Sequence, residues 1–339
     1  MAGNIGAGII GCGGVHVMHA NALMELQGVT LRGLCDNKPD RADASARRYG
    51  GVAYTDYRKL LEDPSVDVIH ITLPHYLHAQ VTIDALKAGK WVLCEKPMAI
   101  STANARAMIA ASDAVGGKLG IIFQNRYNAA SIRLKKIVEC GELGAIKGLR
   151  GMVNWYRNDA YYSDDWHGRK ALEGGGVMMN QAIHTLDLMQ WIGGEALNVY
   201  GMIGTASHAV DVEDMASLRI VFTGGAVGIF HATVSYVADT DVELEVFCEN
   251  GTLLLRGNSL YQVNKKGLLE PLVGKTAGTK EGKTYWGTGH QLQIADFYHS
   301  IQAGLPVCID GRQGFSALAI VQALYESAKT RKTVSVEKP

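Results

Sequence analysis

The sequence predicts an α/β protein with two parts: a doubly wound parallel sheet, then an open and mostly antiparallel sheet. Up to residue 123, apolar strand-like runs alternate with helix-like runs, which is typical of βαβ units. Long strand-like runs later follow one another across glycine turns, which is typical of antiparallel pairing. We therefore expect one domain over residues 1–124 and a second over residues 125–339, whose last helices pack back on the first.

Size and charge narrow the class of protein. The chain has 339 residues, 47% of them hydrophobic, and its 33 Lys plus Arg balance its 33 Asp plus Glu. This length favours two domains, and the balanced charge provides no electrostatic attraction for nucleic acid. No leader-like start or membrane-length apolar run is present. The six cysteines form no C-x-x-C pair, so we expect reduced thiols, no metal site, no membrane partner and a cytoplasmic location.

The first strand, expected over residues 5–10, ends in a glycine turn. Gly11, Gly13 and Gly14 follow it, and helical spacing begins near His16. Glycines permit the sharp turn and let a pyrophosphate approach the backbone, where helix N-terminal amides face it. An ordinary glycine turn is the alternative, because His16 occupies the third glycine position of the G-x-G-x-x-G pattern.

The second strand, expected over residues 29–35, ends in Asp36. An acidic residue about 20 positions beyond such a turn accepts the adenosine ribose hydroxyls of NAD. Asp36 would repel the extra phosphate of NADP, although Lys38 and Arg41 could pair with one, so the sequence favours NAD over NADP. Alternatively, Asp36 only caps the helix expected over residues 39–49.

A lysine ends the buried strand expected over residues 91–94, in the run Glu95-Lys96-Pro97. Ligands of open α/β sheets bind outside the carboxyl ends of the strands, so this ammonium group would lie where cofactor and substrate meet. Pro97 permits a cis peptide bond that fixes the direction of Lys96. By residue type alone, a solvated loop lysine is the alternative.

The remaining elements of the first half complete the alternation. A strand over residues 66–73 precedes Pro74 and a helix that contains His78, which could line the cleft. His70 interrupts the strand and is expected to be a hydrogen-bonded core residue. A helix over residues 103–114 and a strand over residues 119–123 follow.

The second half begins with a helix over residues 129–140 and then becomes strand-rich. The expected strands cover residues 147–156, 197–205, 215–222, 226–236, 241–248 and 252–256, before a polar loop over 274–289 and helices over 291–302 and 314–330. Alternating apolar residues on the outer face of this sheet would suit contacts within a homodimer or homotetramer.

Three glycines at residues 174–176 precede a helix expected to continue through residue 191. Within it, Asn180, His184 and Asp187 are spaced by four and three, so they would share one face. Such a polar stripe is either a hydrogen-bonded structural network or a proton-transferring histidine that its neighbours orient toward the cleft.

On these motifs the sequence resembles the Gfo/Idh/MocA family of nicotinamide-dependent oxidoreductases. The matching pieces span nearly the whole chain: Gly11 and Gly13 with His19, Asp36, Pro74 with His78, Glu95-Lys96-Pro97, the three glycines with His184 and Asp187, and Gly304 with Pro306. The resemblance implies a Rossmann domain joined to an α/β domain. It also implies NAD(P)-dependent hydride exchange with a secondary alcohol of a sugar, a polyol such as inositol, or a sugar derivative.

Carried over by position, the resemblance makes Lys96 and His184 the catalytic pair. Asp187, which the spacing places on the same face, would orient the histidine. Asn180 replaces an aspartate of many relatives, so it would bind a substrate hydroxyl while His184 and Lys96 perform the acid and base work. The expected cofactor ligands are Gly11, Gly13, Gly14, His16, Asp36, Asn37, Leu73, Pro74, His78, Glu95, Lys96, Pro97, Asn125 and Arg126. The expected substrate ligands are Lys96, Tyr127, Arg157, Tyr162, Trp166, His167, Asn180 and His184.

Two other functions stay open at this point. A dinucleotide-binding sensor would have the same fold without the chemistry, although a sensor needs neither Lys96 nor His184. A hydrolase or epimerase that oxidises its substrate only transiently would consume substrate without accumulating NADH.

Overall fold

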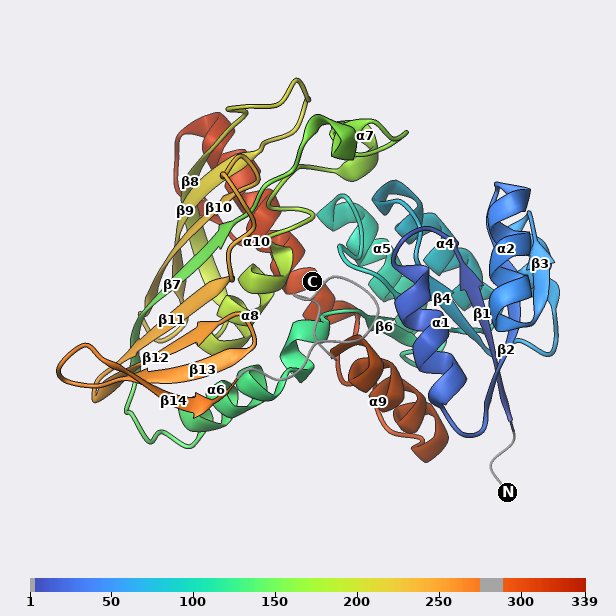
Figure 1. Ribbon diagram of the computed structural model, residues 1–339, viewed down its shortest axis with the longest axis horizontal. Helices are drawn as coiled ribbons and strands as arrows, with labels where there is room; N and C mark the ends of the chain where they lie inside the picture. Colours follow the sequence, from blue (N-terminus) through green and yellow to red (C-terminus); the bar gives the residue numbers. More distant parts are fainter. Residues whose placement is uncertain (1–3, 275–288) are drawn as a thin grey trace.

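The computed structural model describes residues 4–274 and 289–339 and contains two sheets (Figure 1). The first has six parallel strands in the order β3-β2-β1-β4-β5-β6, the doubly wound arrangement that the sequence predicts. Its strands are β1 (Ile5–Ile10), β2 (Val29–Cys35), β3 (Val52–Tyr54), β4 (Val68–Ile71), β5 (Trp91–Cys94) and β6 (Leu119–Ile121). The accompanying helices are α1 (His16–Glu25), α2 (Pro39–Tyr49), α3 (Tyr57–Glu62), α4 (His75–Lys87) and α5 (Thr102–Asp113).

The second sheet has nine strands in the order β14-β13-β12-β11-β7-β10-β9-β8-β15. All neighbours pair antiparallel except β7 and β10, which confirms the predicted mostly antiparallel sheet. The strands are β7 (Ile146–Asn154), β8 (Ala196–Gly204), β9 (Met215–Phe222), β10 (Val227–Thr233), β11 (Glu243–Cys248), β12 (Gly251–Arg256), β13 (Ser259–Val263), β14 (Leu269–Val273) and β15 (Val334–Ser335). The helices are η1 (Gln124–Tyr127), α6 (Ala129–Glu139), η2 (Asp159–Tyr162), α7 (Lys170–Glu173), α8 (Ile183–Gly193), α9 (Gly289–Ala303) and α10 (Gly311–Thr330).

The sequence analysis missed several short elements: α3, α7, β3, β13, β14 and β15. Strand β14 carries Pro271, which lacks an N–H and is tolerated because β14 forms the edge of its sheet. Strands β3 and β15 have three and two residues, too few for an alternating pattern to be recognised.

The predicted helix after the three glycines is wrong at its start, because α8 begins at Ile183 and leaves Asn180 outside it. The carboxylate of Glu213 accepts hydrogen bonds from the backbone amides of Gly176 (2.8 Å) and Met178 (3.1 Å). These contacts hold the preceding residues in irregular turns up to Ala182. Asn180 and His184 therefore lie on different elements.

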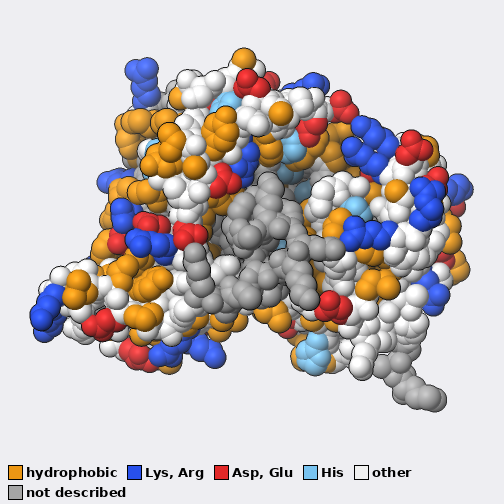
Figure 2. Space-filling model, viewed as in Figure 1, with side chains coloured by type: hydrophobic (Ala, Val, Ile, Leu, Met, Phe, Trp, Pro, Cys, Tyr) orange, Lys and Arg blue, Asp and Glu red, His pale blue; other side chains and the backbone are white. Residues whose placement is uncertain are grey.

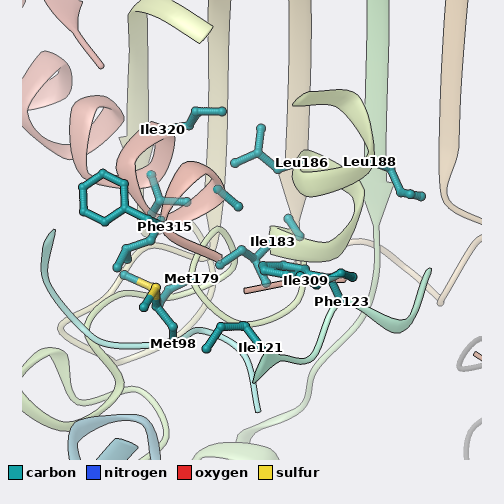
Figure 3. Packing of buried hydrophobic residues seen from close by; sticks show 14 of the residues in the cluster. Met98, Ile121, Phe123, Met179, Ile183, Leu186, Leu188, Ile309, Phe315 and Ile320 are labelled. Atoms are coloured by element: carbon teal, nitrogen blue, oxygen red, sulfur yellow. The ribbon is translucent and has the colours of Figure 1, made fainter. Parts of the chain in front are cut away.

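The hydrophobic core runs through both halves of the molecule. Figure 3 shows Met98, Ile121 and Phe123 from the first half beside Ile183 of α8 and Phe315 of α10, all in one buried cluster. A second cluster joins β1 and α1 to Phe297 and Tyr298 of α9. Helices from the end of the chain thus complete the packing of the first sheet.

Two further sequence expectations concern the polar loop and the absence of a membrane-spanning segment. The polar loop predicted over residues 274–289 lies, apart from its two end residues, outside the described residues. None of the helices in residues 4–274 and 289–339 combines the length and the apolar character that a bilayer-spanning helix requires.

We expect Gly176→Ala to lower the free energy of unfolding by about 1–3 kcal/mol, because overpacking has that typical cost. An added Cβ would lie 1.8 Å from the carbonyl oxygen of Glu213, and this neighbour is backbone. Gly204→Ala is the control, since a Cβ there would meet no atom within 4 Å. Urea denaturation measures both variants, and equal stability of the two would contradict the packing argument.

Candidate active site

A cavity of about 920 Å³ opens where strands of the parallel sheet end, and the second half of the chain covers it. This is the expected ligand position in such a sheet. The predicted site residues that line it are Gly11, Gly13, Gly14, Asp36, Asn37, Leu73, Pro74, Glu95, Lys96, Asn125, Arg157, Trp166, His167, Asn180 and His184. Residues that are distant in sequence, from both halves of the chain, therefore meet around one cavity.

The glycine turn after β1 leaves room for a dinucleotide. Gly11 has a φ of 103°, and a Cβ there would lie 2.5 Å from the carbonyl oxygen of Thr72. A Cβ at Gly13 or Gly14 would meet no protein atom within 4 Å, so the backbone there faces open space. This is the space that a pyrophosphate needs to approach the turn and the start of α1.

Asp36 ties this turn to the end of β2. Its carboxylate accepts hydrogen bonds from the backbone amides of Cys12 and Lys38, both at 2.9 Å. Asp36 also lines the cavity, in the position that suits the adenosine ribose of NAD. The turn and Asp36 together fit the cofactor that the sequence predicts.

Lys96 connects the two halves of the site. The Lys96–Pro97 peptide bond is cis. The ammonium group of Lys96 donates to two oxygens of Asn180, the backbone carbonyl at 2.9 Å and Oδ1 at 3.2 Å. The lysine therefore points across the cavity toward the segment that precedes α8.

His184 lies in the first turn of α8 and faces the same cavity. Burial, together with the nearby Lys96 ammonium, holds the pKa of His184 well below its ordinary value. The imidazole is consequently neutral near neutral pH and can accept a proton.

A buried hydrogen-bond network lies beside Lys96. Glu95 Oε1 is 2.9 Å from His19 Nε2 and 3.2 Å from His290 Nε2, and His19 Nδ1 is 2.8 Å from His70 Nδ1. His70 Nε2 is in turn 2.9 Å from the Tyr298 hydroxyl, which confirms His70 as a hydrogen-bonded core residue. Although burial alone would raise it, the bonds from the two histidines hold the pKa of Glu95 well below its usual range.

The structure places some predicted cofactor ligands away from the described cavity lining. His16 contacts the Gly13 carbonyl oxygen and Ser45 Oγ, so it braces the glycine turn. The ring of His78 lies between two backbone carbonyl oxygens, with Nδ1 2.7 Å from that of Pro97 and Nε2 2.8 Å from that of Leu73. His78 therefore supports the lysine loop from behind, with Pro97.

The structure also corrects the predicted roles of Arg126 and Asp187. They form a buried ion pair, in which Arg126 Nη2 lies 2.6 Å from Asp187 Oδ1 and Nε lies 2.8 Å from Oδ2. Asp187 thus binds Arg126, contrary to the expectation that it orients His184. Arg126 is 6% exposed, which removes it from the cavity surface as a cofactor ligand.

Two predicted substrate ligands also lie outside the described lining. The Tyr127 hydroxyl donates to Asp296 at 2.6 Å. Tyr162 packs against Tyr161 and His208, with ring centroids 5.0 and 4.9 Å away. The neighbouring Tyr161 lines the cavity instead.

Other lining residues were missed, although some of them lie beside predicted site residues in the sequence. These are Trp155, Asp164, Asp165, Gln181 and His290, among others. Asp165 reaches Lys38 of the first half, with Oδ2 3.4 Å from Nζ. This exposed pair links the covering loop to the sheet that it covers, and such pairs contribute little to stability.

The fold and this site define an NAD-binding oxidoreductase. Residues 5–123 match the family model described as "Oxidoreductase family, NAD-binding Rossmann fold", and residues 132–254 match that of the "GFO/IDH/MocA C-terminal domain". The chain belongs to the Gfo/Idh/MocA family, as its sequence motifs indicate.

Known members of the family are similar along most of the chain. Inositol 2-dehydrogenase of Rubrobacter xylanophilus is 30% identical over 257 residues, which cover 74% of this chain and 70% of the relative. The WlbA dehydrogenase of Bordetella pertussis, solved with NADH and UDP-GlcNAcA, superposes with a TM-score of 0.87 at 26% identity over 99% of this chain and 100% of its own. A levoglucosan dehydrogenase solved with NADH and levoglucosan has the same TM-score and coverage at 25% identity.

We expect the protein to lose stability as the pH falls below about 6.5, the ordinary histidine pKa. Burial lowers the pKa of His70 well below that value, so His70 stays neutral in the folded protein and gains a proton on unfolding. The unfolded state then binds more protons, and each such histidine costs up to about 1.4 kcal/mol per pH unit.

Urea denaturation of the protein and of His70→Gln, at about pH 5.5 and about pH 7.5, measures this loss of stability. The variant should lose less stability between the two values than the unsubstituted protein does. His299→Gln, at an exposed position, should leave the difference unchanged. An identical pH dependence in all three proteins would refute the prediction that His70 causes part of this loss of stability.

Proposed function

We propose that the protein transfers a hydride between NAD and a secondary alcohol or ketone of a sugar, a polyol such as inositol, or a sugar derivative. The observation that carries this proposal is that Lys96 and His184, from opposite halves of the chain, line the same cavity as the glycine turn and Asp36. A sensor needs no such pairing of an ammonium group with a neutral imidazole.

Within this proposal, His184 is the general base, and its neutral imidazole takes the proton of the substrate hydroxyl. Lys96 stabilises the developing negative charge on that oxygen and polarises the carbonyl in the reverse direction. Bound NAD supplies the hydride acceptor. Because Asn180 cannot accept a proton as an aspartate would, it binds and orients through its amide group.

The substrate class is supported by the chemistry of the cavity wall. Trp155, Tyr161 and Trp166 offer aromatic faces, and Asn180 and Gln181 offer amide groups. Such faces pack on the apolar side of a sugar ring while the amides bind its hydroxyls. The relatives named for inositol and levoglucosan act on substrates of this kind.

We expect Lys96→Ala and His184→Ala each to lower kcat by about two to four orders of magnitude, the usual contribution of a positioned acid or base. NADH affinity should change little, because the glycine turn and Asp36 are untouched. A panel of sugars, inositols and nucleotide sugars with NAD identifies the substrate, and NADH fluorescence measures binding. Lys87→Ala, an exposed lysine on α4, is the control.

Three outcomes would overturn the proposal. Normal rates in both variants would refute the roles of Lys96 and His184. Tight NADH binding without turnover of any compound would indicate a sensor. Loss of substrate without accumulation of NADH would indicate a hydrolase or epimerase that uses NAD transiently.

We further propose that the protein forms a homodimer or homotetramer through the outer face of its large sheet, and that it works in the cytoplasm. Large apolar side chains are exposed there, including Tyr200, Met202 and Ile229. Figure 2 shows hydrophobic side chains on the part of the surface that the second sheet forms. Several large exposed apolar side chains on one face of a sheet favour a protein contact. The six cysteines are free, which suits a reducing compartment.

We expect Ile229→Lys to reduce the mass of the particle in light scattering, because a charge would be buried in the contact. Ile229 is 52% exposed in one chain, so the fold itself should tolerate lysine. Met24→Lys, which replaces a residue that is 60% exposed on α1, should leave the mass unchanged. If light scattering gives the mass of a monomer for the unsubstituted protein, the proposed oligomer is wrong.

A further inference from the structure

Glu173 is a buried carboxylate next to the proposed catalytic groups. The proposed hydride-transfer mechanism does not use it. It ends α7 and is 1% exposed. Its Oε2 accepts a hydrogen bond from the backbone amide of Gly168 (2.6 Å), and its Oε1 accepts one from Asn180 Nδ2 (2.7 Å). Glu173 is not among the described residues that line the cavity, but it is hydrogen-bonded to Asn180, which does line it.

The Asn180 amide has two different ends, and its neighbours decide which way each end points. Nδ2 donates to Glu173 and, at 3.0 Å, to the Tyr161 hydroxyl oxygen. Both hydrogens of the amide are then used, and Oδ1 is left to accept from Lys96 Nζ. An ionised Glu173 can only accept hydrogen bonds, so it holds Asn180 in this orientation.

We propose that Glu173 is a positioning residue that, in its ionised form, orients the Asn180 amide so that Asn180 Oδ1 holds the Lys96 ammonium group. This inference rests on the proposed hydride-transfer function. The negative charge that an aspartate at position 180 would place directly on Lys96 is here one hydrogen bond further away, on Glu173.

Protonation of Glu173 would disturb this arrangement. A protonated carboxyl group must donate its O–H, while its two neighbours in the structure, Gly168 N–H and Asn180 Nδ2, are donors as well. The amide would have to turn to accept that proton, and its NH₂ group would then face the Lys96 ammonium. Burial, with the nearby Glu213 carboxylate, raises the pKa of Glu173 to about 7, although Lys96 and the hydrogen bonds from Asn180 and Gly168 lower it. The two states therefore exchange near neutral pH.

The pH profile separates Glu173 from His184. The pKa of His184 lies well below its ordinary value, so its protonation would reduce kcat/KM only in more acidic solution. We expect an acid limb near pH 7, from Glu173, in the unsubstituted protein. Glu173→Gln should abolish this limb and lower kcat by about 10- to 100-fold through misplacement of Lys96, with a smaller change in KM.

A double variant tests the direction of the effect. Glu173→Gln/Asn180→Asp moves the carboxylate to position 180 and puts an amide donor at position 173. We expect it to recover about tenfold of the kcat lost in Glu173→Gln, because Lys96 again contacts a fixed acceptor. Glu326→Gln, at an exposed position of α10, is the matched control, and thermal unfolding checks that every variant folds.

A titration without substrate keeps this inference separate from the proposed function. In isotope-labelled lysine samples, the Lys96 side-chain resonance, assigned with Lys96→Ala, should shift near pH 7 in the unsubstituted protein but not in Glu173→Gln. Absence of NAD reduction with every compound would overturn the proposed function, and the resonance would still report on Glu173. An acid limb or a resonance shift that persists in Glu173→Gln would overturn the role of Glu173.

Discussion

The contact between Lys96 and Asn180 is the interaction on which the site depends. Lys96 follows a strand of the parallel sheet, while Asn180 precedes the helix that packs on the large sheet, and two hydrogen bonds join them. Each half of the molecule supplies only part of the site. The first half supplies the glycine turn and Asp36, and the second half supplies the segment with His184. A change in how the sheets pack would therefore separate Lys96 from His184 before it disrupted either sheet.

The surroundings of Lys96 explain how a lysine can be held in one direction. Glu95 is buried between His19 and His290, and His78 lies between the Pro97 carbonyl oxygen of the lysine loop and the Leu73 carbonyl oxygen after β4. These groups lie behind the lysine, with every bond directed at a fixed partner. Networks of this kind rigidify their neighbourhood when all members are satisfied. The Lys96 ammonium group thus projects from a rigid base, as its proposed catalytic role requires.

Strand ends could be predicted from the sequence, and side-chain partners could not. Apolar runs that stop at Asp36 and Lys96 mark the carboxyl edge of a parallel sheet, so the location of the site was predictable. Spacing alone wrongly placed Asn180 on the helix of His184, and it wrongly predicted that Asp187 orients this histidine. Glu213 and Arg126, which decide these two points, approach from distant segments. Glu173 carried no signal, because its importance arises only from burial beside Asn180.

The second hydrophobic cluster has a consequence for biosynthesis. Helix α9, which packs on α1 through Phe297 and Tyr298, is synthesised after the strands β7 to β14 of the second sheet. The nucleotide-binding half therefore waits, with part of its apolar surface uncovered, until those strands and α9 have been made. Domains usually fold in order during translation. Here the packing of the first sheet is completed only after the second sheet has been synthesised, so a nascent chain truncated near residue 124 would be a client for chaperones.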